Sequence, residues 1–203
     1  MTGICSVILA AGSSRRLGFN KLTLKIDSET VIRRSVFPFL EADLGSVVVV
    51  AGPSASLIAQ ELDGLNTTVV YNENHASGMS SSVKAALPWL RGAKAVFFHL
   101  GDKPFVKKKL LEDMVEAYRT TGKNIVIPVC KGKKGHPVLI SVAPYLDEMR
   151  GLDGDRGLRE VIEKHKEDVL CIEADEDVLF DIDTADDIRS LKQRGYKVEK
   201  GKS

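Results

Sequence analysis

The chain has 203 residues, of which 43% are hydrophobic and 28% are charged, and its formal net charge is +1. This composition is that of an ordinary globular protein, and the small net charge gives no general attraction to nucleic acid or to an anionic membrane. No apolar run approaches the roughly 20 residues that a membrane span needs. We expect a cytoplasmic protein with neither nucleic acid nor a membrane as partner, built as one domain over 1–195 with a polar tail over 196–203.

Short apolar runs rich in β-branched residues alternate with segments of helical periodicity along the chain. The runs predict strands over 4–10, 46–52, 67–72, 93–100 and 123–129, and the segments between them predict helices over 29–43, 54–62, 79–90 and 106–121. Further short strands are predicted over 136–141, 167–174 and 178–183, some of them antiparallel, followed by a helix over 184–194 capped by Thr184 and a frayed end. The alternation predicts an α/β fold, a single three-layer α/β/α Rossmann-like domain with a mostly parallel sheet. Ligands of such sheets bind beyond the carboxyl ends of the strands.

The loop after the first predicted strand combines small residues with positive charge in the sequence LAAGSSRRLGFNK, residues 9–21. Gly12 and Gly18 let backbone amides approach an anion, and Arg15, Arg16 and Lys21 supply charge for phosphate oxygens. Neither the Walker pattern nor the GxGxxG dinucleotide pattern is present. The loop therefore indicates a phosphate site of another kind, and the alternative is a solvated basic loop.

Two other strand ends are acidic. HLGDKP, residues 99–104, places Asp102 after a strand and before a proline, where it could hold a hard cation such as Mg²⁺ or simply cap a turn. FDIDTADDI, residues 180–188, places Asp181 and Asp183 on the same side of an extended segment. Asp186 and Asp187 are better explained as first-turn charges of the following helix.

Three further loops carry polar or charged groups. In 72–87, Gly78 and the following serines form a small turn that could contact a nucleobase or ribose, or could cap the helix that follows. GKKGHPVLI, residues 132–140, and GLDGDRGLRE, residues 151–160, complete the set. Arg156 and Arg159 in the latter could meet a phosphate, while Asp155 and Arg159 could instead form a helix-stabilising pair.

Taken in order, LAAGxSxRxGxxK, GMxxS, GDxP, GHP, GDxGxR and DIDT resemble the motifs of the molybdenum cofactor nucleotidyltransferases, the MobA-like NTP transferases of the nucleoside-diphospho-sugar transferase fold. Two positions depart from the usual pattern, with Leu17 in place of methionine and Lys103 in place of glutamine. The resemblance implies that Lys21, Arg16 and Asp102 serve catalysis, and that Asp102 and Asp183 bind Mg²⁺. It implies acceptor-binding roles for His136, Arg156 and Arg159. The residues that it assigns to the nucleotide are Leu9, Ala10, Ala11, Gly12, Ser14, Arg16, Lys21, Gly78 and Ser82.

The same resemblance implies transfer of CMP from CTP to the terminal phosphate of molybdopterin, with release of pyrophosphate. A recipient molybdoenzyme or its chaperone is the further partner that it implies. CTP is favoured because guanine-specific relatives typically have LAGG where this chain has LAAG. The alternatives are GTP as donor, a sugar or alcohol phosphate as acceptor, or a related protein without transferase chemistry. That last class includes a nicotinamide-dependent oxidoreductase and a non-catalytic pterin-binding protein.

Overall fold

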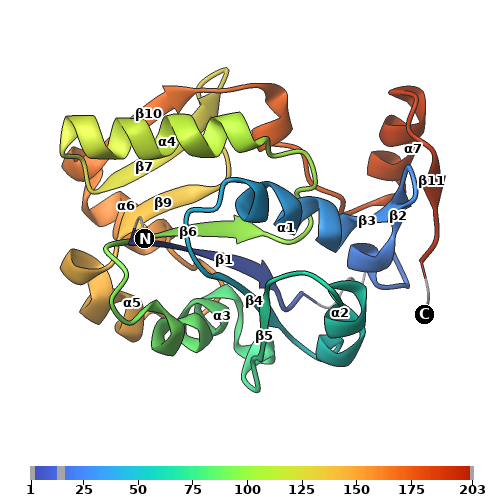
Figure 1. The fold of residues 1–203 in the computed structure, drawn as a ribbon, viewed down its shortest axis with the longest axis horizontal. Coiled ribbons are helices and arrows are strands. Elements are labelled where there is room, and N and C mark those ends of the chain that lie inside the picture. The colour runs from blue at the N-terminus through green and yellow to red at the C-terminus, as the bar shows by residue number, and fades with distance from the viewer. Residues whose placement is uncertain (1–2, 13–16, 202–203) are drawn as a thin grey trace.

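A computed structural model describes residues 3–12 and 17–201 of the chain, and its centre is a mixed, mostly parallel sheet (Figure 1). The strands run in the spatial order β10-β7-β9-β6-β1-β4-β5, and β8 pairs with β7. Their bounds are β1 Ile4–Ala10, β4 Val47–Ala51, β5 Thr68–Tyr71, β6 Ala95–Leu100, β7 Ile125–Cys130, β8 Lys133–Lys134, β9 Val138–Ser141 and β10 Val169–Glu173. The five principal predicted strands are confirmed, with shifts of one or two residues at their ends.

Parallel and antiparallel pairs divide the sheet. β1 pairs in parallel with β4 and β6, β4 with β5, and β7 with β10. β9 lies between β6 and β7 and runs antiparallel to both. The predicted mixed, mostly parallel α/β sheet is therefore confirmed.

Helices cover both faces of this sheet, and their bounds are α1 Val31–Glu41, α2 Ala55–Glu61, α3 Met79–Ala86, α4 Lys108–Thr121, α5 Leu146–Gly151, α6 Arg159–Lys164 and α7 Ala185–Gln193. Consecutive residues of a strand direct their side chains to opposite faces of the sheet. Phe97 belongs to the core cluster that includes buried residues of α1 and α4, whereas Phe98 belongs to the cluster that includes buried residues of α3, α5 and α6. Within the described residues, no helix is long and apolar enough to span a bilayer.

A small second sheet lies beside α7, where the C-terminal segment returns to the N-terminal part of the chain (Figure 1). Its antiparallel strands are β2 Lys25–Ile26, β3 Glu29–Thr30 and β11 Val198–Glu199. The expectation that the C-terminal tail is frayed is wrong for these strand residues. Pairing of β11 with β2 holds the tail, and the ring of Tyr196 lies 5.2 Å from that of Phe105.

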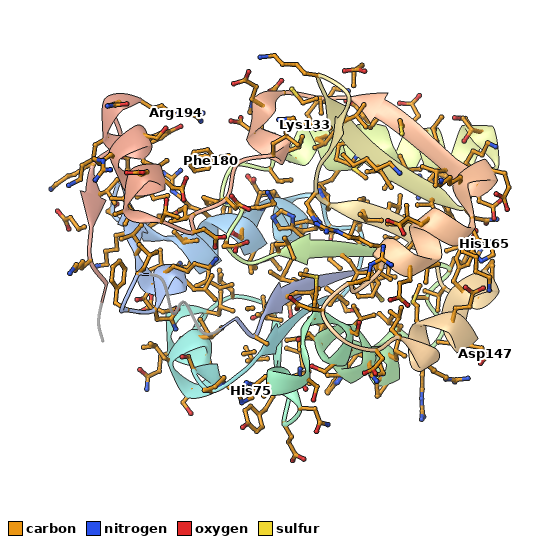
Figure 2. The ribbon with its side chains drawn as sticks, turned by 180° about the vertical axis from the view of Figure 1, so that it is seen from behind. His75, Lys133, Asp147, His165, Phe180 and Arg194 are labelled. Carbon is orange, nitrogen blue, oxygen red and sulfur yellow. The ribbon has the colours of Figure 1, made fainter. Side chains whose placement is uncertain are left out.

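The segment 178–183 does not form the predicted strand, although its apolar and acidic residues alternate. It begins in a 3₁₀ turn, Glu176–Val178, and continues as irregular chain. The following helix α7 has the predicted N-cap, because the Thr184 hydroxyl accepts a hydrogen bond from the Asp187 amide while the Asp187 carboxylate accepts one from the Thr184 amide. At the other end of α7, Arg194 lies over the ring of Phe180, 4.7 Å from its centroid (Figure 2).

Candidate active site

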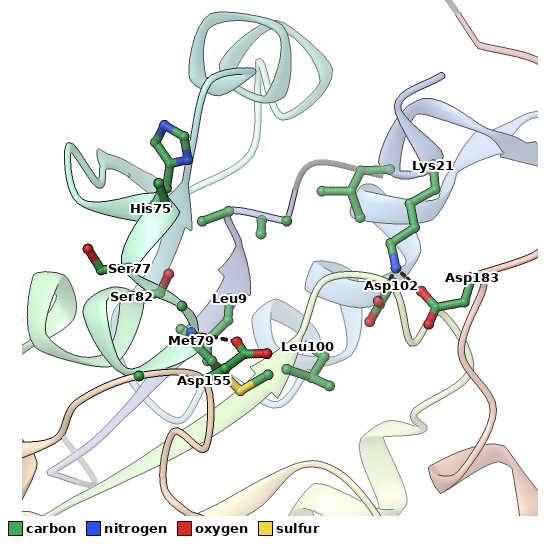
Figure 3. Close-up of a pocket in the computed structure, with 17 residues that line it drawn as sticks. Leu9, Lys21, His75, Ser77, Met79, Ser82, Leu100, Asp102, Asp155 and Asp183 are labelled. Atoms are coloured by element: carbon green, nitrogen blue, oxygen red, sulfur yellow. Dashed lines mark hydrogen bonds and ion pairs between the residues drawn. The ribbon is translucent and has the colours of Figure 1, made fainter. Parts of the chain in front are cut away.

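A cavity of about 880 Å³ lies at the carboxyl ends of β1 and β6. Segments far apart in the sequence form its wall (Figure 3). The lining residues are Leu9, Ala10, Ala11, Gly12, Lys21, Leu22, His75, Ala76, Ser77, Gly78, Met79, Ser82, Leu100, Asp102, Gly154, Asp155 and Asp183. The cavity thus lies where an open α/β sheet binds its ligands.

The loop after β1 contributes backbone and small side chains to this wall. Ala11 passes so close to Gly52, at the end of β4, that a Cβ at position 52 would lie 2.7 Å from the Ala11 carbonyl oxygen. This close contact restricts the backbone of the loop. Residues 9–12, which the sequence analysis assigned to the nucleotide, line the cavity. Ser14 and Arg16, to which the sequence assigned nucleotide contacts, lie outside the described residues.

Lys21 is placed by a short 3₁₀ helix, Lys21–Thr23. Asn20 caps this turn, because its side-chain oxygen accepts a hydrogen bond from the Leu22 amide at 3.0 Å. The Thr23 hydroxyl donates to the Asn20 carbonyl at 2.9 Å, which ties the turn together. The backbone that carries Lys21 is therefore well held, while its long side chain runs along one wall of the cavity to Asp102 and Asp183 (Figure 3).

The Lys21 ammonium joins two carboxylates, one from the loop after β6 and one from the segment before α7. Its Nζ donates hydrogen bonds to Asp102 Oδ2 and to Asp183 Oδ1, the latter at 2.5 Å. Burial acts to lower the pKa of Lys21, but the carboxylates of Asp102 and Asp183 outweigh it, so the pKa lies above its ordinary value. The structure thus brings together three residues that the sequence placed in one site.

The donor set at Asp102 and Asp183 fits a divalent cation. Asp102 Oδ1 is buried, and no residue in 3–12 or 17–201 gives it a hydrogen bond. Carboxylate oxygens from two chain segments are the hard donors that Mg²⁺ and Mn²⁺ prefer.

A second lysine, Lys103, is next to Asp102 in the sequence and contacts the segment before Asp183. Lys103 Nζ donates to the Leu179 carbonyl at 2.8 Å and lies 3.7 Å from Asp181 Oδ2, with only 6% of its side chain exposed. Burial lowers the pKa of Lys103 against the opposing effect of Asp181 and Asp102, and burial raises the pKa of Asp181. Lys103 therefore ties the loop after β6 to the segment that carries Asp183.

The opposite wall is formed where the start of α3 meets the 153–157 loop. Gly78 has φ of +90°, and a Cβ there would lie 2.6 Å from the Gly154 carbonyl oxygen. The Met79 amide donates to Asp155 Oδ1 at 3.0 Å, and the Ser80 hydroxyl donates to the Asp153 carbonyl at 2.9 Å. Two loops distant in sequence thus form one surface.

Asn72 supports this wall from within. Its side-chain nitrogen donates to the hydroxyls of Ser81 and Ser82, at 2.8 and 3.0 Å. Ser82 also lines the cavity, and both hydroxyls help to anchor α3 to the end of β5.

The three predicted acceptor residues do not line this cavity. His136 donates its backbone amide to the Val178 carbonyl at 3.1 Å, and burial lowers the pKa of its ring to about 4. Arg156 pairs with Glu163 at 2.6 Å on the surface, and Arg159 begins α6. The alternative pairing of Asp155 with Arg159 within a helix is not formed, since Asp155 precedes α6 and binds the Met79 amide.

The sequence analysis assigned no binding or catalytic role to several lining residues: Leu22, His75, Ala76, Ser77, Met79, Leu100, Gly154 and Asp155. Leu100 could have been identified as a lining residue, because it is the last residue of a predicted strand. Asp155 becomes a lining residue only because the 153–157 loop folds onto α3, and no pattern in the sequence predicts that contact.

The fold and the site are those of a nucleotidyltransferase. The family model of the MobA-like NTP transferase domain matches residues 6–169, and the chain belongs to this family. It is 28% identical over 194 residues to the molybdenum cofactor cytidylyltransferase of Escherichia coli, covering 96% of this chain and 98% of that protein.

Solved structures agree with this assignment. A homologue of Mycobacterium tuberculosis Rv0371c from Mycobacterium sp. strain JC1 superimposes with a TM-score of 0.83 at 27% identity, over 95% of this chain and 96% of that one. Rv0371c from M. tuberculosis in complex with manganese gives a TM-score of 0.78 at 25% identity, over 94% and 98% of the two chains. The predicted nucleoside-diphospho-sugar transferase fold is therefore confirmed.

Proposed function

We propose that this protein transfers CMP from CTP to the terminal phosphate of molybdopterin, with Mg²⁺ as cofactor and pyrophosphate as second product. The observation that carries the proposal is the convergence of Lys21, Asp102 and Asp183 on one wall of a cavity that the glycine-containing loop also lines. Similarity to the E. coli cytidylyltransferase along 96% of the chain supports the choice of donor and acceptor.

In this proposal the nucleotide occupies the cavity between its two walls. The backbone at 9–12 lies beside the triphosphate, Gly78 and Ser82 lie beside the nucleoside, and Lys21 supplies a positive charge to the phosphates. Ser14 and Arg16, which lie outside the described residues, are assigned to the nucleotide on the family motif alone.

Asp102 and Asp183 would hold Mg²⁺, which when bound neutralises charge on the triphosphate and on the departing pyrophosphate. An oxygen of the acceptor phosphate forms a bond to the α-phosphorus of CTP, and the bond from that phosphorus to the β-phosphate bridging oxygen breaks. Such a step depends on positioning and electrostatic stabilisation and needs no nucleophilic side chain. Lys21 is suited to stabilise the developing negative charge, because it is a cation on the cavity wall beside the 9–12 backbone.

The acceptor is proposed to approach from the side of the 153–157 loop, where Gly154 and Asp155 line the cavity. Arg156 would exchange Glu163 for the acceptor phosphate, and Arg159 would add a second positive charge. His136, whose buried ring has a pKa lowered to about 4, is assigned to the acceptor on the family motif alone. We propose that the protein works in the cytoplasm and hands its product to a recipient molybdoenzyme or its chaperone.

The test is a pyrophosphate-release assay with CTP, GTP, ATP and UTP, with and without Mg²⁺, and with molybdopterin, a sugar phosphate or an alcohol phosphate as acceptor. Release with CTP that requires both Mg²⁺ and molybdopterin is the expected result. Preference for GTP would keep the reaction and overturn the choice of base. Release with another phosphorylated acceptor only would overturn the pterin assignment, and no release with any triphosphate would overturn the transferase proposal.

A further inference from the structure

We infer that Lys21 is a latch on the metal site: its ammonium bridges Asp102 and Asp183 until a nucleotide triphosphate draws it away. Binding of a divalent cation is thereby coupled to binding of the nucleotide. The inference rests on the proposed function, since it concerns how the same carboxylates receive their cation.

The latch is visible as one ammonium shared between two carboxylates (Figure 3). Lys21 comes from the turn after the first loop, Asp102 from the end of β6, and Asp183 from the segment before α7. The Lys21, Asp102 and Asp183 side chains are 11%, 19% and 29% exposed, so water screens the contact only in part.

The ammonium and a divalent cation compete for the same oxygens. Asp102 Oδ2 and Asp183 Oδ1 both accept hydrogen bonds from Nζ, and these atoms belong to the pair of carboxylates that suits a cation. A cation held by both carboxylates would stand next to the like charge of Nζ, which opposes its binding. In the absence of a nucleotide, the Lys21 ammonium therefore opposes entry of a cation as long as it holds both carboxylates.

A nucleotide triphosphate removes this obstacle by offering Lys21 new partners. Lys21 lies on the cavity wall together with the 9–12 backbone, so phosphate oxygens bound there come within the range of its flexible stem. Hydrogen bonds to Asn20 hold the backbone of the turn that carries Lys21. The C-terminal segment also packs directly on this turn, because a Cβ on Gly201 would lie 1.8 Å from the Thr23 carbonyl oxygen. Only the side chain has to move.

This coupling makes the site discriminate between a free cation and a cation bound to a nucleotide. A cation that arrives alone binds weakly, whereas a cation that arrives with a triphosphate finds both carboxylates released. The site therefore favours the metal–nucleotide complex over the free metal. Removing the ammonium should strengthen metal binding without nucleotide, even though the same change is expected to impair catalysis.

The test is binding of Mn²⁺ without nucleotide, measured by the loss of the free Mn²⁺ signal in electron paramagnetic resonance. Wild type is compared with Lys21→Met and Lys21→Gln, two neutral replacements of similar length. Lys107→Met is the matched control, because Lys107 also bridges two carboxylates, Asp175 at 2.5 Å and Asp177 at 3.2 Å, but lies outside the cavity wall. Thermal unfolding of each variant verifies that it is folded.

We expect both Lys21 variants to bind Mn²⁺ at least tenfold more tightly than wild type, and Lys107→Met to leave the affinity at the cavity unchanged. Adding Asp102→Asn to Lys21→Met should abolish the gained binding. Equal or weaker binding by the folded Lys21 variants would overturn the latch. Pyrophosphate release by the wild type reports separately on the proposed function, so a latch that fails leaves the transferase proposal standing if that release is observed.

Discussion

The backbone amide of Ile182 donates a hydrogen bond to the backbone carbonyl of Asp102, with 3.2 Å between nitrogen and oxygen. This bond joins the loop after β6 to the segment before α7, and each of these segments carries one carboxylate of the site. Asp102 itself takes part in this backbone contact, and Asp183 directly follows Ile182. The distance between the two carboxylates is therefore set by the main chain as well as by Lys21.

Replacing either Lys21 or Asp102 by alanine should reduce turnover by more than about 100-fold, because each change removes electrostatic stabilisation at the reacting phosphates. The measurement is the steady-state rate of pyrophosphate release under saturating CTP and Mg²⁺. Asp186→Ala serves as the control, since Asp186 is 74% exposed and pairs with Arg189 on the surface of α7. A turnover in Lys21→Ala or Asp102→Ala similar to that of the control would remove that residue from the mechanism.

Lys103→Met should destabilise the fold by about 1–2 kcal/mol, because the Leu179 carbonyl loses its charged donor and Asp181 loses its ion pair. Urea unfolding followed by circular dichroism gives the free energy of unfolding. The matched change is Lys107→Met, which removes an exposed ion pair and should alter stability by less than about 0.5 kcal/mol. Equal stability of the two variants would show that Lys103 does not tie the two segments together.

Gly78→Ala should weaken CTP binding and destabilise the protein by about 2–3 kcal/mol, because a Cβ would meet the Gly154 carbonyl and the residue has positive φ. Gly64→Ala isolates the backbone contribution, since Gly64 has φ of +78° but open space around its missing Cβ. We expect Gly64→Ala to cost about 1 kcal/mol and to leave the KM for CTP unchanged. A KM that is unchanged in Gly78→Ala would place the nucleotide elsewhere.

The stability of the protein should fall as the pH is lowered from about 6.5 toward 4. Burial lowers the pKa of His99 to about 3 and that of His136 to about 4, from an ordinary value of 6.5, so the unfolded chain takes up protons first. Each histidine contributes up to about 1.4 kcal/mol per pH unit in that window. His99→Gln should reduce the slope of unfolding free energy against pH, and an unchanged slope would contradict the burial of a neutral His99.

The sequence predicted the parallel strands well because each is a continuous buried run bounded by turns and charge. It failed for 178–183, where the alternation of apolar and acidic residues imitates a strand. There the Asp183 amide donates to the Asp187 carboxylate, and the Ile182 amide donates to the Asp102 carbonyl. These amides therefore do not form the regular series of hydrogen bonds that pairs two strands. It also failed for Val198–Glu199, because a two-residue strand depends on a distant partner that no local pattern shows.

Lys21, Asp102 and Gly78, which the sequence placed in the candidate site, all line the cavity, because each stands in a loop that follows a predicted strand. Asp155 and Asn72 were missed because their positions depend on contacts between loops, which only the packed fold creates. The division of the chain at residue 195 stays a prediction, although β11 shows that the segment beyond it pairs with the rest of the structure.

The most direct measurement follows a radioactive phosphate from CTP into the pterin product. CTP labelled at the α-phosphate and CTP labelled at the γ-phosphate are each incubated with the protein, Mg²⁺ and molybdopterin, and the products are separated. We predict that the α label enters the pterin product while the γ label leaves as pyrophosphate. Entry of the γ label into the pterin, or failure of the α label to enter it, would contradict nucleotidyl transfer to molybdopterin.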